Sequence, residues 1–309
     1  MPKAGTVALV GRPNAGKSTL LNRLLGEKLA IVSDKPQTTR HRIVGILSKE
    51  DRGQIVFYDT PGVHRPLHRL NQQMVSHALD ALNDADLVCL LVDASEPFGN
   101  GDAYMLDLVA KAESPKILLL NKIDRVEKNT LLPKIAKYAA HGEGATFSEV
   151  IPVSARTGDG CDILLEKLWG ALREGEAMYD PELLTIHPER FLVTERIREK
   201  MLHATRDELP FSTAVLLERW EDEESTPPTK PGLVKIWASL LVEKPGQKSI
   251  LIGRGGAKIK EIGTAARMDL EQYLGKKVFL DLQVKLEPNW REDKALLAQL
   301  ERDVDLNLG

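Results

Sequence analysis

Glycine, lysine and serine recur at a fixed spacing near the start of the chain, in the stretch GRPNAGKS from Gly11 to Ser18. In the pattern G-x-x-x-x-G-K-[ST], backbone N–H groups surround a β-phosphate, and Lys17 brings an ammonium between the β- and γ-phosphates. The Ser18 hydroxyl can ligate Mg²⁺. A glycine turn without a ligand would not require lysine and serine at those places. The stretch therefore predicts a nucleotide site.

Two later motifs would complete a site for a guanine nucleotide. In DTPG, Asp59 can hold Mg²⁺ through water and the Gly62 N–H can reach a γ-phosphate. In NKID, the Asp124 carboxylate can accept N1–H and N2–H of guanine. Adenine offers neither group, and an unpaired buried acceptor costs about 1–3 kcal/mol. SAR, residues 154–156, can place a backbone N–H against guanine O6.

A second glycine cluster lies in ILIGRGGAKIK, residues 250–260. It fails the dinucleotide pattern G-x-G-x-x-G, because Lys258 stands where the last glycine should be. It satisfies G-x-x-G at residues 253–256, which is similar to the KH loop. There, glycine permits close approach to the backbone of single-stranded RNA and Arg254 adds charge. The alternative is a glycine-rich connector between a strand and a helix.

Charge is concentrated at this second cluster. Residues 188–309 contain 20 Lys and Arg against 21 Asp and Glu, so that half of the chain is not basic overall. From Lys244 to Lys260, however, there are five basic residues and no acidic one. RNA affinity should therefore be focused at the loop and fall with salt. The predicted RNA contacts are Lys248, Ile252, Gly253, Arg254, Gly255, Gly256, Lys258 and Lys260, with Ile250–Ile252 as hydrophobic support.

Short apolar runs precede each nucleotide motif. TVALV, QIVFYD, LVCLLVDA, KILLLNK and EVIPVSA alternate with amphipathic stretches between Thr6 and about Leu172, which predicts a mostly parallel sheet with helices on both faces. In such sheets ligands bind at the carboxyl ends of the strands. We therefore expect the motifs to converge on one site.

The alternation of apolar runs and amphipathic stretches ends at EGEAMYDPELLTIHP, residues 174–188. The glycine, prolines and acidic residues of this segment are typical of a linker. Beyond it we expect helix RFLVTERIREKMLHAT, strands TAVLLERW and LVKIWASLLVE, the glycine loop, helix AKIKEIGTAARMDLEQYLG, strand KVFLDLQVKLE and a terminal helix. Two domains, residues 1–173 and 189–309, also suit a chain of 309 residues.

Composition narrows the class of protein. Hydrophobic residues at 42% and charged residues at 28% are typical of a globular protein, and a net charge of −3 argues against a surface that coats nucleic acid throughout. Cys89 and Cys161 do not form the pattern of a disulfide framework or a metal site, so we expect a reducing, cytoplasmic compartment and no disulfide partner. No run approaches the about 18 apolar residues that span a bilayer, and peripheral contact with the cytoplasmic face of the inner membrane stays open.

The nucleotide motifs, in this order and spacing, resemble the GTPase domain of translation-factor-related P-loop proteins. QTTRHRIVG, residues 37–45, narrows the resemblance to the bacterial Era family, and RFLVTERIREK and VEKPGQKSILIGRGGAKIKEIG are also similar to that family's pattern. The resemblance implies an α/β P-loop GTPase domain followed by an α+β type II KH domain. It also implies a GTPase that binds the single-stranded 3′ region of 16S rRNA and acts in 30S ribosomal subunit assembly and rRNA maturation.

The resemblance also implies roles for single residues. Residues 37–45 lie where the first switch should be, and Thr39, in preference to Thr38, is expected to close over Mg²⁺ and the γ-phosphate. The expected catalytic residues are Lys17, Thr39 and Gly62, and the expected Mg²⁺ ligands are Ser18, Thr39 and Asp59. The expected GTP contacts are Gly11, Arg12, Pro13, Asn14, Ala15, Gly16, Lys17, Ser18, Thr19, Asp59, Thr60, Pro61, Gly62, Asn121, Lys122, Asp124, Ser154 and Ala155.

Two positions bear on the rate of hydrolysis. Val63 follows DTPG, where many regulatory GTPases carry a glutamine that orients the attacking water, so slow intrinsic hydrolysis is expected. Asn14 is a candidate K⁺ ligand, as in related GTPases with this asparagine, and a structural turn residue is an equal alternative. Two other interpretations stay open. The chain could be an RNA-binding assembly protein that senses GTP without turnover, or an ATP-using motor or kinase, which NKID disfavours.

Overall fold

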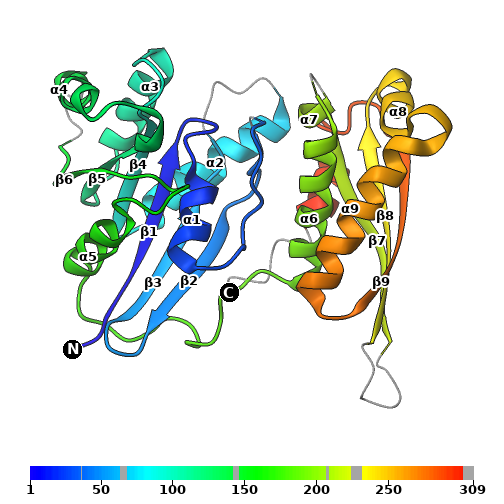
Figure 1. Cartoon of the computed structure of the whole chain (residues 1–309), viewed down its shortest axis with the longest axis horizontal. Helices are drawn as coiled ribbons and strands as arrows, with labels where there is room; N and C mark the ends of the chain where they lie inside the picture. The colour runs from blue at the N-terminus through cyan, green and yellow to red at the C-terminus, as the bar shows by residue number, and fades with distance from the viewer. Residues whose placement is uncertain (36, 63–67, 142–145, 207–208, 224–231, 302–309) are drawn as a thin grey trace. The chain divides into compact units, whose positions relative to one another are not determined.

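The computed structural model describes residues 1–35, 37–62, 68–141, 146–206, 209–223 and 232–301. The chain divides into two compact units (Figure 1). The first comprises Met1–Leu67 and Asn71–Ile186, and the second comprises His68–Leu70 and His187–Gly309. The division after Ile186 falls inside the segment 174–188 that the composition marks as a linker.

The first unit is built on a six-stranded sheet. Its strands are β1 (Lys3–Gly11), β2 (Ile43–Lys49), β3 (Gly53–Asp59), β4 (Leu87–Asp93), β5 (Lys116–Asn121) and β6 (Glu149–Pro152), in the order β2-β3-β1-β4-β5-β6. Neighbours are parallel except β2 and β3, which pair antiparallel at one edge. The central strands β4 and β5 are buried almost throughout, as strands covered on both faces should be. The predicted, mostly parallel sheet is confirmed.

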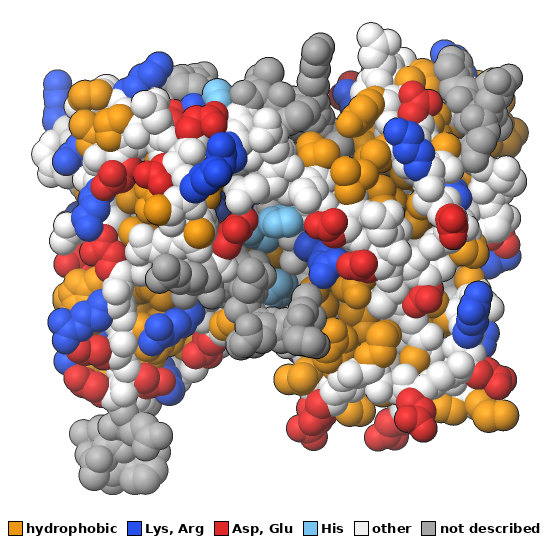
Figure 2. Space-filling model, turned by 180° about the vertical axis from the view of Figure 1, so that it is seen from behind, with side chains coloured by type: hydrophobic (Ala, Val, Ile, Leu, Met, Phe, Trp, Pro, Cys, Tyr) orange, Lys and Arg blue, Asp and Glu red, His pale blue; other side chains and the backbone are white. Residues whose placement is uncertain are grey.

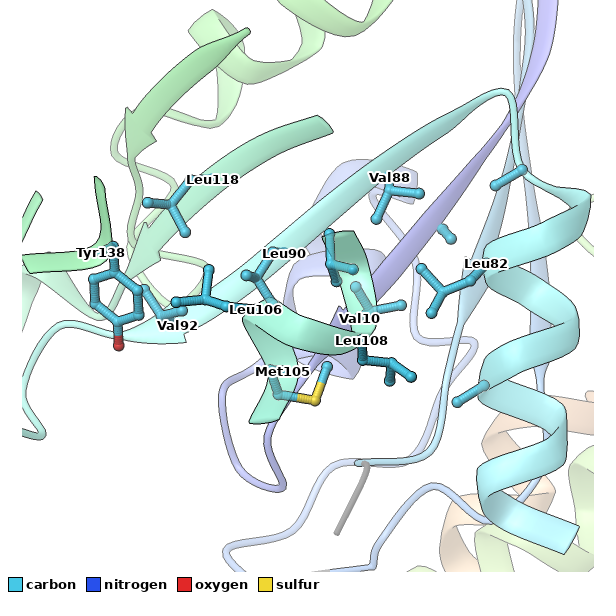
Figure 3. Close-up of a cluster of buried hydrophobic side chains, with 14 of the residues drawn as sticks. Val10, Leu82, Val88, Leu90, Val92, Met105, Leu106, Leu108, Leu118 and Tyr138 are labelled. Carbon is cyan, nitrogen blue, oxygen red and sulfur yellow. The ribbon is translucent and has the colours of Figure 1, made fainter. Parts of the chain in front are cut away.

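Helices cover both faces of this sheet. They are α1 (Lys17–Leu25), α2 (Arg69–Asp84), α3 (Asn100–Ala110), α4 (Leu131–His141) and α5 (Cys161–Ala171). One core joins Val10 of β1, Leu90 of β4, Leu82 of α2, Met105 of α3 and Tyr138 of α4 (Figure 3). The alternate strand residues are equally buried and face the layer that holds α1 and α5, because successive side chains of a strand point to opposite faces.

The segment after α5 is hydrogen-bonded to the first unit by Gln54 of β3. This side chain is fully buried, and its Oε1 accepts the N–H groups of Met178 at 2.8 Å and Tyr179 at 2.9 Å. Its Nε2 donates to Tyr179 O at 2.8 Å and to Ser48 Oγ at 3.1 Å. One glutamine amide therefore fixes two consecutive residues of the predicted linker.

The same segment also follows β2. The Ile46 N–H donates to Leu184 O at 2.8 Å, and Thr185 Oγ1 donates to Val44 O at 2.5 Å. Since β2 begins at Ile43, within the predicted first switch of residues 37–45, the linker contacts the strand that carries the end of this switch into the sheet. We call Gln54 and these two β2 contacts the linker clasp.

The second unit is a three-stranded sheet with helices. Its strands are β7 (Ala214–Glu223), β8 (Leu233–Val242) and β9 (Lys277–Leu286), with β7 and β8 antiparallel and β8 and β9 parallel. Its helices are α6 (Glu189–Ala204), α7 (Leu209–Ser212), α8 (Pro245–Ile252), α9 (Ala257–Leu274) and α10 (Lys294–Glu301). α6 packs on α9 and β7, and α8 and α9 pack on β9. The predicted α+β class is confirmed.

The structure corrects the prediction for residues 250–252. The sequence suggests that all three are hydrophobic support for the loop, but they form the last turn of the helix α8, which begins at Pro245. Leu251 is fully buried, whereas Ile250 is 55% exposed and does not belong to the core. Eight residues that include a glycine give little helical periodicity, so the sequence pattern did not reveal α8 between the predicted strand LVKIWASLLVE and the glycine loop.

Candidate nucleotide and RNA sites

A cavity of about 390 Å³ joins several of the predicted motifs in the first unit. Predicted contacts that line it are Pro13, Asn14, Gly16, Lys17, Ser18, Thr19, Thr39, Gly62 and Lys122. The lining also includes Ile31, Val32, Ser33, Asp34, Gln37, Thr38 and Arg125, which sequence reasoning did not single out as contacts. Residues 31–34 precede the predicted first switch, Gln37 and Thr38 lie within it, and Arg125 follows NKID; of these, only Thr38 was weighed, as the less favoured alternative to Thr39.

The Asn121 side chain ties two loops of this site together. It is 1% exposed, its Nδ2 donates to Ala15 O at 2.7 Å, and its Oδ1 accepts from the Ala155 N–H at 3.0 Å. Gly16 precedes α1 with φ +98°, and a Cβ there would lie 2.2 Å from Asn121 Nδ2. Only glycine therefore fits at position 16, where the phosphate loop passes the Asn121 side chain.

Lys17 is a buried cation at the start of α1. Its side chain donates to Gly11 O and Arg12 O, each at 3.2 Å. Burial lowers the pKa of Lys17 to about 8, and the nearby Asp59 carboxylate opposes that shift. A phosphate beside the ammonium would favour the charged form in the same way.

The three side chains that are expected to bind Mg²⁺ lie together beside Lys17. Ser18 Oγ donates to Asp59 Oδ2 at 2.6 Å and lies 2.8 Å from Thr39 Oγ1. Burial raises the pKa of Asp59 to about 6, and the nearby Lys17 ammonium opposes this shift. Asp59 Oδ1 is buried and has no hydrogen-bond partner within the described part of the chain. Hydroxyls and a carboxylate with an unsatisfied oxygen suit Mg²⁺, so the residues present fit this ion.

The segment that carries Thr39 also contacts the phosphate loop. Asn14 has φ +62°, and its Nδ2 donates to Asp34 O at 2.9 Å. The neighbouring Thr38 is turned differently from Thr39, because its Oγ1 donates to Lys35 O at 2.6 Å. Asn14 therefore occupies a left-handed turn position and holds the switch segment at the same time.

The residues expected to read the base are also connected. Ser154 Oγ donates to Asp124 Oδ1 at 2.7 Å, and the Thr157 N–H donates to Ser154 Oγ at 3.1 Å. Ser154 is fully buried, and Lys122 Nζ donates to Asp93 Oδ2 at 2.5 Å. The Asp124 carboxylate is thus oriented by one of its oxygens, which leaves the other for a ligand.

Ten other predicted contacts do not line this cavity, and among them Asp124 is exposed. They are Gly11, Arg12, Ala15, Asp59, Thr60, Pro61, Asn121, Asp124, Ser154 and Ala155. Arg12 is turned toward α3, where its Nη1 donates to Asp102 Oδ2 at 2.8 Å, and Thr60 Oγ1 donates to Leu9 O at 2.8 Å. Val63 lies outside the described residues.

In the second unit, the G-x-x-G loop connects α8 to α9. Gly253 has φ +72° and ψ 175°, and a Cβ there would lie 2.7 Å from the Lys258 Cβ. A Cβ on Gly255 or Gly256 would meet no atom within 4 Å. The loop is therefore closed on the side of Gly253 and open at the next two glycines, where another backbone can approach.

The predicted cations differ in their surroundings. Arg254 and Lys260 are exposed, and Lys248 is half-buried on α8. Lys258 Nζ lies 2.8 Å from Glu261 Oε2. On the face seen in Figure 2, basic and acidic side chains are interspersed over both units. Positive charge is therefore a local property of the loop.

A cavity of about 460 Å³ lies beside this loop. It is lined by His203, Ala204, Thr205, Arg206, Leu209, Ile250, Lys258 and Glu261. The exposed Ile250 gives it an apolar side.

Comparisons with known proteins agree with this division of the chain. A family model described as 50S ribosome-binding GTPase matches residues 6–122, and a KH domain model matches residues 216–291. GTPase Era of Geobacter metallireducens is 46% identical over 298 residues, covering 96% of this chain and 97% of the relative. GTPase Era of Leuconostoc citreum is 47% identical over 301 residues, covering 96% of each chain.

Solved structures of Era proteins are also similar to this chain over almost its full length. Era in complex with MgGDPNP and nucleotides 1506–1542 of 16S ribosomal RNA superposes with a TM-score of 0.90 at 36% identity, covering 97% of this chain and 99% of that one. A variant of Aquifex aeolicus Era bound to GDP·AlF4⁻ superposes with a TM-score of 0.88 at 36% identity, covering 96% of this chain and 98% of that one. With a GTPase unit followed by a KH unit and full-length identity well above 30%, the chain belongs to the GTPase Era family.

Proposed function

We propose that this chain hydrolyses GTP to GDP and phosphate in the first unit. In the second unit it holds the single-stranded 3′ region of 16S rRNA during 30S subunit assembly and rRNA maturation. The observation that carries the proposal is the hydrogen-bonded cluster of Ser18, Thr39 and Asp59 beside the buried Lys17, because it brings a set of Mg²⁺-type oxygens and a phosphate cation to one cavity.

In this mechanism the phosphates lie across the start of α1. Backbone N–H groups of the phosphate loop and the Lys17 ammonium stabilise the charge that develops as water attacks the γ-phosphate. Gly62 supplies a further N–H. Ser18, Thr39 and Asp59 would hold Mg²⁺, which neutralises charge on the β- and γ-oxygens. Val63 cannot hydrogen-bond to the attacking water, so the intrinsic rate is slow.

Guanine is selected at Asp124, whose orientation by Ser154 supports the assignment. Replacing Asp124 by asparagine exchanges an acceptor for a donor, so it should shift preference from guanine toward xanthine. Competition of GTP and XTP against a fluorescent nucleotide measures the shift. Unchanged GTP binding by the variant would refute the assignment and reopen the ATP-using alternative.

The RNA assignment is supported by the open glycines and by the exposed cation beside them. A nucleic acid backbone can approach Gly255 and Gly256, and Arg254 and the start of α9 favour a phosphate there. The Era relative solved with nucleotides 1506–1542 of 16S rRNA indicates which RNA to test. Crosslinking the protein to cellular RNA and sequencing the fragments would identify the bound region.

Potassium is proposed as an additional cation at Asn14. Because Nδ2 is engaged with Asp34 O, Oδ1 is the atom that can ligate a cation near the phosphates. Phosphate release should then be faster in KCl than in NaCl at equal ionic strength, and the difference should vanish in Asn14→Ala. Equal rates in the two salts for the unmodified chain would leave Asn14 as a turn residue only.

We place this activity in the cytoplasm, with peripheral contact at the inner membrane as a further proposal. In the described ranges no helix is both long and apolar enough to cross a bilayer. Sedimentation with vesicles of inner-membrane lipids tests the contact.

We also propose residues 1–173 and 189–309 as the two domains, with residues 174–188 between them. Limited proteolysis of the full chain, with the fragments identified by mass spectrometry, tests these bounds.

Single-turnover phosphate release decides whether the chain is an enzyme. Release should be slow alone and faster with K⁺ and RNA, and absent in Lys17→Ala. No release above background under any condition would favour the alternative, an RNA-binding assembly protein that senses GTP or GDP without turnover.

A further inference from the structure

The loop that follows β6, residues 154–157, has a support from outside the nucleotide motifs. Arg23 of α1 donates from Nε to Ala155 O at 3.3 Å and from Nη2 to Arg156 O at 2.5 Å. Two consecutive carbonyls of the loop are thus turned toward one guanidinium. Its planar, fixed array of donors suits such a pair better than a lysine would.

Turning these carbonyls also orients the neighbouring N–H groups. In a trans peptide the C=O and N–H point in opposite directions, so an Arg156 carbonyl facing α1 directs the Thr157 N–H away from it. That N–H donates to Ser154 Oγ at 3.1 Å, and Ser154 Oγ in turn donates to Asp124 Oδ1 at 2.7 Å. A chain of hydrogen bonds therefore runs from Arg23 to the carboxylate expected to read guanine.

Ala155 is held through both of its backbone groups. Its N–H, in the peptide that joins it to Ser154, donates to Asn121 Oδ1 at 3.0 Å, and its carbonyl, in the peptide that joins it to Arg156, accepts from Arg23. Asn121 belongs to a nucleotide motif, but Arg23 does not. Without Arg23, the carbonyls of residues 155 and 156 would lose the donors that orient them, so the peptides on either side of Arg156 would be less fixed.

The position of Arg23 on α1 links the two ends of the nucleotide. Lys17 begins this helix beneath the expected phosphates, and Arg23 lies six residues later, about 9 Å along the axis. The helix is rigid over this distance. The phosphate end and the base end of the site are therefore held in register by one element.

We propose that Arg23 is a positioning residue for guanine recognition, which sets the peptides of residues 155–157 and, through Ser154, the Asp124 carboxylate. The proposal rests on the proposed base site at Asp124. Arg23 is largely exposed and touches no ligand group, so its effect is confined to contacts that depend on the guanine edge.

The test compares two nucleotides that share phosphates, ribose and the purine ring. GDP carries O6, N1–H and the 2-amino group, whereas purine riboside 5′-diphosphate carries none of them. Arg23→Met keeps the aliphatic stem and removes the donors. Affinities come from competition against a fluorescent GDP analogue with Mg²⁺, on the full chain. Arg52→Met is the matched control, because Arg52 is an arginine of the same unit that pairs with Glu166.

Arg23→Met should weaken GDP about five- to tenfold, the effect expected for losing about one net hydrogen bond. It should change affinity for purine riboside diphosphate less than twofold. Arg23→Lys, with one donor group, should lie between, and Arg52→Met should match the unmodified chain for both ligands. Equal losses for the two nucleotides, or no loss of GDP affinity, would overturn the proposal.

A parallel measurement with Asp124→Asn separates this proposal from the one on which it rests. If that variant fails to gain xanthosine diphosphate binding, the base site itself is wrongly placed. If it gains xanthosine diphosphate binding while Arg23→Met weakens both nucleotides equally, only the role of Arg23 is refuted.

Discussion

The nucleotide site and the G-x-x-G loop are both expected to bind phosphate, yet they are built in opposite ways. In the nucleotide site the side chains around the phosphate loop are buried and connected: Lys17, Asp59 and Asn121 are at most 5% exposed. In the loop, Arg254 is exposed, and the surfaces of Gly255 and Gly256 are open.

The difference follows from the size of the ligand. A nucleotide can be enclosed, and burying polar groups is favourable only when each has a partner, so the residues of an enclosing site become interdependent. A polynucleotide must cross the surface, so its contacts stay exposed, screened by salt and nearly independent of each other. One substitution should therefore damage the first site far more than the second.

Lys17→Ala should give the largest effect. Hydrogen bonds from a buried ammonium to phosphate contribute about 3 kcal/mol, which corresponds to a loss of about 100-fold in GTP affinity. Titration calorimetry with a non-hydrolysable GTP analogue measures it. Lys49→Ala, at an exposed lysine of β2, is the control and should bind normally. A loss below tenfold in Lys17→Ala would contradict an interdependent site.

Gln54→Leu asks whether the linker belongs structurally to the nucleotide unit. The change leaves the Met178 and Tyr179 N–H groups and the Tyr179 carbonyl without their partner, so we expect a loss of about 3 kcal/mol in the free energy of unfolding. Urea unfolding of the GDP-loaded chain measures the loss, and residues 176–183 should become sensitive to protease. Gln72→Leu, at an exposed glutamine of α2, should behave like the unmodified chain.

Replacing Gly253 and Gly255 by alanine, one at a time, tests whether the loop is closed at the first glycine and open at the second. Gly253 has a backbone conformation that is nearly restricted to glycine and faces Lys258, so alanine should destabilise the α8–α9 connection by about 2–3 kcal/mol. Gly255 is in the ordinary left-handed region with open space, so alanine there should cost about 1 kcal/mol. Hydrogen exchange of the α9 amides measures both. Equal effects would mean that the Lys258 contact is not restrictive.

The smallest expected effect is a change in the salt dependence of RNA binding. Each phosphate neutralised on a single strand contributes about −0.7 to the slope of log K against log salt concentration, so Arg254→Ala should reduce the slope by about that amount. Lys258→Ala should reduce it less, because Glu261 already accompanies that ammonium. Fluorescence anisotropy with a single-stranded RNA from the 16S 3′ region, at several KCl concentrations, gives the slopes. A larger change for Lys258 than for Arg254 would reverse this assignment.

The nucleotide cavity could be anticipated because its motifs are local. Each follows an apolar run, and strands of a parallel sheet present their carboxyl ends together, so Lys17, Gly62 and Lys122 meet wherever the rest of the chain goes. The preference for Thr39 over Thr38 came from family resemblance, and the structure places Thr39 beside Ser18.

What the sequence did not reveal depends on contacts between distant residues. Gln54 looks like any polar residue of a strand, and only the fold shows that residues 178–179 cover it. Likewise Arg23 is one of two cations on an amphipathic helix, and its partners lie more than 130 positions away. The helix α8 was missed for a different reason, since it is too short to show a period.

The linker clasp also sets how much of the linker is free chain. Thr185 is held on β2 and α6 begins at Glu189, so residues 186–188 are the part of the linker between the last clasp contact and the helix. An undocked segment of residues 174–188 would behave as a coil with a root-mean-square span of about 21 Å. The clasp therefore replaces most of that coil with chain that is fixed on β2 and β3.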